Sequence, residues 1–150
     1  MPAATRERLT QLVAASREYE AQAEQVQMQI DLLNQTIAAT RIAGETVEHL
    51  KNLQNGDEIL LPLGDLAFIK AKVMDSSNVI VNIGASVTVE KPIEQAKEIF
   101  DQRVEDLTKA QMQLRQGLQQ IIQKLQQLRN EIEKLATQMQ QGSQPSAVGS

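Results

Sequence analysis

The sequence contains no cysteine and no tryptophan, and its 150 residues include only one histidine. Without cysteine the chain has no disulfide scaffold, no thiolate metal site and no cysteine nucleophile. A single histidine, His49, is too few for a histidine zinc site or a charge-relay triad, so we expect it to be a solvated helical side chain. Aromatic residues make up 2% of the chain, which argues against a thick globular core.

An excess of positive charge and a long apolar run are also missing. The formal net charge is -4, and basic and acidic residues are mixed along the chain, so nucleic acid is not an expected partner. No apolar run approaches the roughly 18 residues of a membrane span, and no apolar signal core opens the sequence. Phosphate-binding loops and clusters of metal-ligating residues are absent from the pattern. We therefore expect a cytoplasmic protein that is not an enzyme, needs no cofactor or metal, and contacts no membrane.

Two long stretches repeat apolar residues at alternating steps of three and four. Good helix formers dominate residues 5–53, which contain no proline and a single glycine, Gly44. We expect this helix to begin near Thr5 and to stop before Asn55 and Gly56. Its inner positions follow a heptad pattern and are Leu9, Leu12, Ser16, Tyr19, Ala23, Val26, Ile30, Leu33, Ile37, Thr40, Gly44 and Val47.

The second heptad stretch occupies residues 92–141 and is more regular. Pro92 suits its first turn, and Gln111 is the one polar residue among its inner positions, where it can fix the register. Those positions are Phe100, Val104, Leu107, Gln111, Leu114, Leu118, Ile121, Leu125, Leu128, Ile132, Leu135 and Met139. Each helix would be roughly 70 Å long. Because such a helix must bury its apolar stripe, we expect the two to fold back on each other as an antiparallel coiled coil.

Between the helices, residues 57–91 alternate with a period of two, which predicts four short strands in two hairpins. For the first hairpin we expect a two-residue turn at Gly64 and Asp65. That register would place on one face Ile59, Leu61, Leu63, Leu66 and Phe68. The other face is partly apolar, so this hairpin should be covered on both sides. Lys70 and Lys72 share a face, and we expect them to be solvated or paired across a subunit interface.

For the second hairpin we expect a three-residue turn at residues 84–86, which aligns the valines and isoleucines of its two strands. Four short strands with two apolar faces are marginally stable alone, so they should complete their core in an oligomer. The predicted interface consists of Ile59, Leu61, Phe68, Ile69, Val79, Val81, Ile83, Val87 and Val89.

The predicted fold is of the α+β class, a long antiparallel coiled-coil hairpin with two β-hairpins at the bend. We expect a single domain over residues 1–141. Residues 142–150 have the composition of a linker and should be disordered.

The middle segment resembles the alpha class of prefoldin subunits. The resemblance rests on the runs GDEILLPLG at residues 56–64, AKV at 71–73, VIVNIGA at 79–85 and VTVEK at 87–91. Two heptad helices flanking two hairpins match the alpha-class layout, whereas beta-class subunits carry one hairpin. This plain layout is similar to the archaeal form, with a eukaryotic paralogue as the alternative.

The resemblance implies a molecular chaperone subunit that acts as an ATP-independent holdase. Two alpha-class and four beta-class subunits would join their strands into a double β-barrel platform that carries six coiled-coil arms. The arm tips would hold unfolded protein clients and pass them to a group II chaperonin. A structural coiled-coil scaffold or adaptor that binds no client is the alternative function.

The arm tips are the predicted client-binding site. In an antiparallel hairpin the start of the first helix meets the end of the second, which brings together Leu9, Leu12, Val13, Leu135 and Met139. These side chains bind clients if the tips fray, and otherwise they only close the coiled coil. Val13 lies off the heptad seam, so we expect it to be the most exposed of the five.

Overall fold

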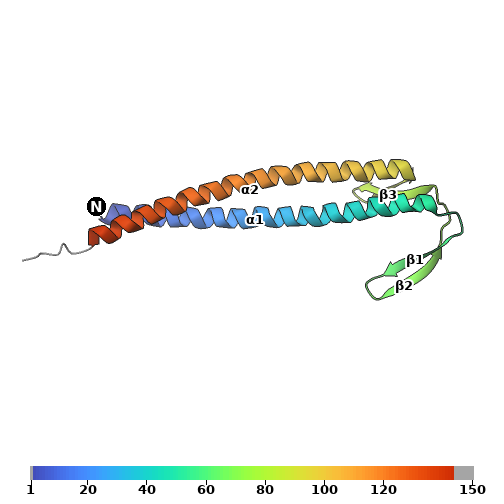
Figure 1. Cartoon of the computed structure of the whole chain (residues 1–150), viewed down its shortest axis with the longest axis horizontal. Coiled ribbons are helices and arrows are strands. Elements are labelled where there is room, and N and C mark those ends of the chain that lie inside the picture. The colour runs from blue at the N-terminus through green and yellow to red at the C-terminus, as the bar shows by residue number, and fades with distance from the viewer. Residues whose placement is uncertain (1, 144–150) are drawn as a thin grey trace, which may run out of the picture. The chain divides into compact units, whose positions relative to one another are not determined.

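The computed structural model describes residues 2–143 and consists of two long helices that flank two β-hairpins (Figure 1). The elements in order are α1 (Pro2–His49), the 3-10 helix η1 (Leu50–Asn52), β1 (Glu58–Leu63), β2 (Ala67–Lys72), β3 (Asn78–Gly84), β4 (Val87–Pro92) and α2 (Ile93–Ser143). This order confirms the predicted α+β class. The chain divides into two compact units, one with the residues up to Leu32 and from Ala110 onward, the other with Leu33–Lys109.

The first helix begins earlier than its sequence pattern indicates. α1 starts at Pro2, so the prediction of a start near Thr5 is wrong. Proline fits a first helical turn because the amide that it lacks would have no partner there. At the other end, α1 stops at His49, and the chain reaches Gly56 with a φ of +90° that favours glycine.

The second helix begins and ends one or two residues later than predicted. Pro92 is the last residue of β4 rather than part of the first turn of α2. α2 continues through Gly142 to Ser143, so the predicted disordered tail does not begin at residue 142. The remainder of that predicted tail, 144–150, lies outside the described residues.

In the first unit, the predicted heptad positions form the packed seam of the coiled coil. No predicted inner position of either helix is fully exposed. The most deeply buried apolar side chains of this unit are Leu12, Ile30, Leu125 and Leu128. Two polar inner residues, Ser16 and Gln111, are buried with them.

In the second unit, the helix ends and the second hairpin share one core. Its buried members are Val47, Val81, Ile93 and Ala96, and half-buried Leu50, Val79, Ile99 and Phe100 pack around them. The helices approach closely here, because a Cβ added at Gly44 would lie 3.6 Å from the Cβ of Phe100. The core of this unit therefore rests on α1, β3 and α2 together.

The first hairpin has a different register from the predicted one. Leu63 lies opposite Ala67, so the turn contains three residues, Gly64 to Leu66, and the predicted two-residue turn is wrong. Since side chains alternate along a strand, this shift of one residue moves every β2 side chain to the other face. Phe68 consequently lies opposite Pro62 and not on the face of the odd-numbered β1 residues.

The second hairpin keeps the predicted register over most of its length. Val81 lies opposite Val89, as the sequence indicates. Near the turn the register shifts, Gly84 pairs with Val87, and Ile83 is left as a bulge. The turn itself contains two residues rather than the predicted three.

Hydrogen bonds from short polar side chains fix the turn between the two hairpins. The Asp75 carboxylate accepts bonds from the side-chain amide of Asn78 and the backbone N–H of Ser77, both at 2.9 Å. These bonds, chiefly the one from Asn78, lower the pKa of Asp75 below its ordinary value. Next to them, the N–H of Ser76 donates to the side-chain oxygen of Asn55 at 2.8 Å.

One ion pair joins the two helices beside the core of the second unit. The Lys97 Nζ lies 2.9 Å from a carboxylate oxygen of Glu48. The hydrogen bond from Lys97 lowers the pKa of Glu48, and the same bond raises the pKa of Lys97. Both shifts mean that the folded chain favours the charged form of each group.

The turn of the second hairpin gives the first testable prediction. Ala85 and Ser86 have φ values of 47° and 62°, the backbone of a type I′ turn, which suits asparagine and glycine better. Left-handed backbone costs an L-residue roughly 1–2 kcal/mol, so Ala85→Asn with Ser86→Gly should stabilise the hairpin by about 1 kcal/mol. Slower hydrogen exchange of the β3 and β4 amides would show this. Ser86→Val should have the opposite effect, and equal exchange in all three proteins would contradict the turn assignment.

The Glu48–Lys97 ion pair predicts a pH-dependent contribution to stability. Because the pKa of Glu48 is lowered in the folded chain, its contribution is present at neutral pH and is lost as the pH falls below about 4.3. Glu48→Gln should therefore lower the thermal midpoint at pH 7, and the difference from the parent should shrink as the pH falls and Glu48 becomes protonated in the folded chain. Glu45→Gln, one turn earlier on α1, is the control. A difference that persists unchanged at acid pH would contradict the assignment.

Candidate assembly and client-binding surfaces

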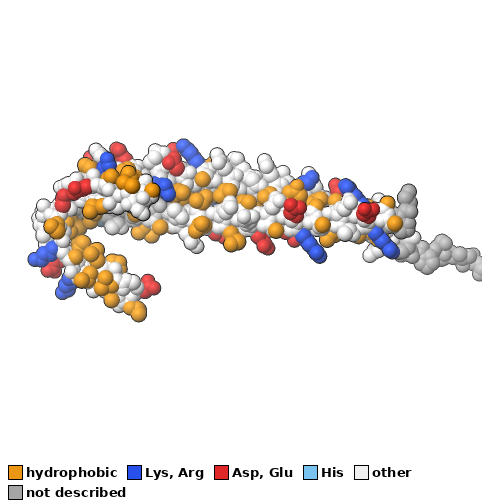
Figure 2. Space-filling view, turned by 180° about the vertical axis from the view of Figure 1, so that it is seen from behind, with side chains coloured by type: hydrophobic (Ala, Val, Ile, Leu, Met, Phe, Trp, Pro, Cys, Tyr) orange, Lys and Arg blue, Asp and Glu red, His pale blue; other side chains and the backbone are white. Residues whose placement is uncertain are grey.

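The first hairpin exposes one wholly apolar face. None of the strand residues of β1 and β2 is buried in the chain. In the observed register this face consists of Ile59, Leu61, Leu63, Ala67, Ile69 and Ala71. Leu61, Leu63 and Ile69 are 46%, 58% and 49% exposed, and Figure 2 shows apolar side chains clustered over this hairpin. A two-stranded hairpin of this kind is marginal without a cover, so the face is a candidate assembly surface.

The opposite face of the first hairpin combines apolar and charged side chains. Leu60 and Phe68 are both more than half exposed, and Pro62 lies opposite Phe68 in the ladder. Lys70 and Lys72 extend from β2 on this same face, and neither makes an ion pair with any residue in the range 2–143. This face is therefore apolar near the turn, and at its other end it carries the two lysines of β2 together with Glu58 of β1, which lies opposite Lys72.

The second hairpin divides its predicted interface residues between the core and the surface. Val81 is only 3% exposed and belongs to the core of its own chain, so it is not free to contact a partner, which corrects its place in the predicted interface. Val79 packs against that core as well, because it shares the face of Val81. Ile83 and Val87, near the turn, remain about half exposed and available.

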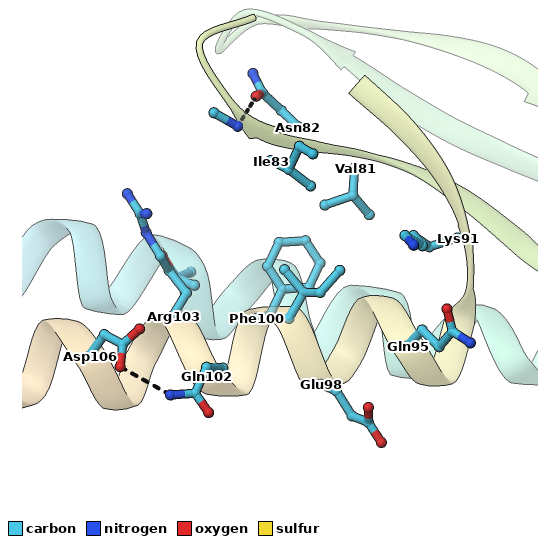
Figure 3. Close-up of a pocket in the computed structure, with 13 residues that line it drawn as sticks. Val81, Asn82, Ile83, Lys91, Gln95, Glu98, Phe100, Gln102, Arg103 and Asp106 are labelled. Carbon is cyan, nitrogen blue, oxygen red and sulfur yellow. Dashed lines mark hydrogen bonds between the residues drawn. The ribbon is translucent and has the colours of Figure 1, made fainter. Parts of the chain in front are cut away.

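An open groove of ≈ 950 Å³ lies between the turn end of the second hairpin and α2. Val81 and Ile83 point from the hairpin toward Phe100, which forms the apolar centre of the groove (Figure 3). Charged side chains of both signs surround this centre, namely Lys91, Glu98, Arg103 and Asp106. The groove offers no nucleophile paired with a base, so it suits apolar contact better than catalysis.

The five predicted tip residues lie in the first unit and are more covered than expected. Leu12 is 5% exposed and closes the seam, so its main role is structural. The other four, Leu9, Val13, Leu135 and Met139, are half-buried. Val13 is more exposed than Leu12, but it is half-buried like the other three, so it does not stand clear of the seam as an exposed residue.

Ion pairs flank the seam on its exposed sides in this same unit. An Arg8 nitrogen lies 3.7 Å from a Glu131 oxygen, and an Arg129 nitrogen lies 3.4 Å from a Glu20 oxygen. All four side chains are about half exposed or more, so these pairs add little to stability. These pairs favour the antiparallel orientation of the two helices, since they link the beginning of α1 to the end of α2.

Sequence reasoning missed a set of exposed apolar side chains on the helices. Met28 and Leu32 of α1 are 71% and 63% exposed, and they lie one turn apart on the side away from the seam. Ile42 of α1 and Met112 and Ile122 of α2 are also exposed. A count of apolar residues at outer heptad positions would have found them, whereas following the seam alone did not.

The described residues hold few other candidates for a functional site. Within residues 2–143 no three or more histidine, aspartate or glutamate side chains come together in a way that could hold a metal ion. In the same range no helix has the length and apolar character needed to cross a membrane. His49 is exposed at the end of α1.

Comparisons with known proteins agree on one family. The prefoldin subunit family matches residues 19–141. Prefoldin subunit alpha of Methanococcoides burtonii is 35% identical over 98 residues, which cover 65% of this chain and 71% of that protein. The corresponding subunit of Methanosarcina mazei is 30% identical over 115 residues, covering 75% and 81%.

Other matches extend over less of the relative or come from structure. Prefoldin subunit alpha of Methanopyrus kandleri is 37% identical over 87 residues, and the match spans 58% of this chain but only 55% of that protein. The cryo-electron microscopy structure of filamentous PFD from Methanocaldococcus jannaschii superposes with a TM-score of 0.69 at 30% identity, covering 79% of this chain and 98% of that one. On this evidence the chain belongs to the prefoldin family, and the relatives it matches there are alpha subunits.

Proposed function

We propose that this chain is the alpha subunit of a cytoplasmic chaperone that holds unfolded polypeptides without ATP and passes them to a group II chaperonin. The observation that carries the proposal is the first hairpin, whose apolar face no described residue buries, in a protein of the prefoldin family. Such a face belongs to a subunit that is completed by others. Membership of the prefoldin family then supports the proposal that the completed complex is a chaperone.

The partners in this proposal are a second copy of the chain and four beta-class subunits. Their strands would join those of this chain in a double β-barrel, which leaves no sheet edge unpaired. The accessible members of the predicted interface support this role, namely exposed Leu61, Phe68, Ile69, Ile83 and Val87 and half-buried Ile59 and Val89. In the chain by itself, solvent reaches part of each of these seven side chains.

Assembly through the first hairpin predicts a sharp effect of one charge. Ile69→Lys places an ammonium group in the middle of the wholly apolar face, where a cover would have to desolvate it. The variant should fail to form the oligomer while its helical circular dichroism stays near that of the parent. Ile42→Lys, on the exposed side of α1, is the matched control and should assemble normally. Sedimentation of the mixed subunits measures both, and a full complex with Ile69→Lys would contradict this interface.

We propose that clients bind at the ends of the helices, through apolar area that the seam leaves partly accessible. Leu9, Val13, Leu135 and Met139 supply this area, while Leu12 holds the seam together. Burying a few hundred Å² at about 25 cal/mol per Å² gives a weak and reversible contact. Several arms acting on one polypeptide would raise the effective affinity.

A four-residue variant tests the client site. Leu9, Val13, Leu135 and Met139 are replaced together by serine, and Leu12 is kept so that the seam remains closed. The assembled complex should then lose most of its protection of an aggregating client, measured by light scattering, with equal results in the presence and absence of ATP. Met28→Ser with Leu32→Ser removes exposed apolar area elsewhere on α1 and should leave protection intact. The reverse outcome would move the client site to the outer face of the helix.

A filament is the second candidate, because the matched filamentous PFD structure covers most of this chain. Electron microscopy of the chain alone distinguishes the two. Filaments would favour this candidate, whereas a species that grows only when a beta-class subunit is added supports the first. A complex that assembles but protects no client would indicate the scaffold role.

A further inference from the structure

The hydrogen bonds at the base of the first hairpin show which backbone groups of β2 point outward. The N–H of Val73 donates to the Asp57 carbonyl at 2.9 Å, and the Val73 carbonyl accepts from the N–H of Gly56 at 2.7 Å. The backbone of Val73 therefore faces β1. Because this direction alternates along a strand, three β2 residues direct their N–H and C=O groups away from β1. These outward residues are Phe68, Lys70 and Lys72.

The free edges of β1 and β4 each lack one backbone hydrogen-bond donor. On β1 the outward residues are the partners of those three, and one of them is Pro62, which has no N–H to donate. On β4 the N–H of Ile93 donates to the Ser77 carbonyl at 3.1 Å, so Pro92 also occupies an outward position. A proline therefore removes one N–H donor from the free edge of β1 and one from that of β4, whereas the free edges of β2 and β3 keep all their N–H donors.

Charge distinguishes the β2 edge from the β3 edge. Lys70 and Lys72 are exposed at successive outward positions. Glu58 lies opposite Lys72 in the ladder, but no residue of 2–143 forms an ion pair with either lysine. The outward residues of β3 are uncharged, namely Asn78, Ile80 and Asn82. Edge lysines oppose pairing with a similar strand, because like charges directly opposite each other destabilise a ladder.

A second copy of this chain does not offer a matching strand. Its own β2 would place lysines against lysines. The other strands supply at most one outward carboxylate each, Glu58 on β1 and Glu90 on β4, and each of these strands also carries the outward proline. Two neighbouring ammonium groups on an intact edge thus call for two carboxylates two residues apart, a pattern that these strands lack.

We propose that the free edge of β2 accepts a strand from the beta-class subunit, and that Lys70 and Lys72 select it through carboxylates at alternate positions of that strand. Backbone hydrogen bonds supply the attachment, and the two lysines supply the choice of partner. An apolar residue of the same strand would lie over Phe68, which is 63% exposed. This inference rests on the proposed function and adds the edge and the chemistry of the partner.

The first test titrates the beta-class subunit encoded in the same genome against three forms of this chain. Lys70→Glu with Lys72→Gln reverses or removes the edge charges without placing a carboxylate opposite Glu58. Lys124→Glu with Lys134→Gln on α2 makes the same change in net charge and is the control. The edge variant should bind roughly 10- to 100-fold more weakly, and the control should bind like the parent.

The outcomes separate this inference from the function on which it rests. If the parent chain forms no complex with the beta-class subunit, both are overturned. If the parent binds and the edge variant binds equally well, or the control is weakened as much, only the inference is overturned. Circular dichroism and β2 amide exchange of each variant show that the hairpin is intact.

A second measurement needs no substitution. A zero-length carbodiimide reagent joins a lysine ammonium to a carboxylate only where the two are in contact. In the complex of unmodified subunits, mass spectrometry should find Lys70 or Lys72 joined to aspartate or glutamate of the beta-class subunit. Joining of these lysines only to another copy of this chain, or to no carboxylate, would overturn the proposal.

Discussion

The narrow apolar stripe of each helix is the constraint on which the rest of the structure depends. A helix as long as α1 is stable in water only while its stripe is covered, and one antiparallel partner supplies that cover. Once α2 occupies the stripe, the side chains of the stripe are not available to the strands, except where the helices end at the hairpins. There Ile93 and Ala96 pack with Val81.

This limited supply of helix surface explains why the two hairpins differ. The second hairpin places one deeply buried side chain in the core formed by the helix ends, so one of its faces is settled within the chain. The first hairpin is fixed by backbone bonds at its base, through Gly56 and Val73, and none of its strand side chains is buried. The chain thus combines a coiled coil whose seam closes within the chain with a hairpin whose apolar face the described residues leave exposed.

Sequence reasoning succeeded where many positions test the same pattern. The seam repeats over more than ten heptad positions in each helix, so a wrong register would have exposed several leucines at once. The register of the second hairpin was found because polar Thr88 and Glu90 mark its outer face. In the first hairpin both faces carry apolar residues, so the pattern could not choose between registers, and the Gly64–Asp65 pair favoured the wrong turn. The degree of exposure of Val13 and Val81 depended on neighbours from distant parts of the chain, which periodicity along a single element does not reveal.

The uncovered hairpin has a consequence for the life of the newly made chain. Until other subunits arrive, its strands present the same kind of apolar surface that misfolded proteins present. A surplus copy would then compete with damaged proteins for the quality-control machinery of the cell. In the proposed assembly, balanced synthesis of the subunits is a physical requirement, because the ratio in which they are made determines how much adhesive surface is left uncovered.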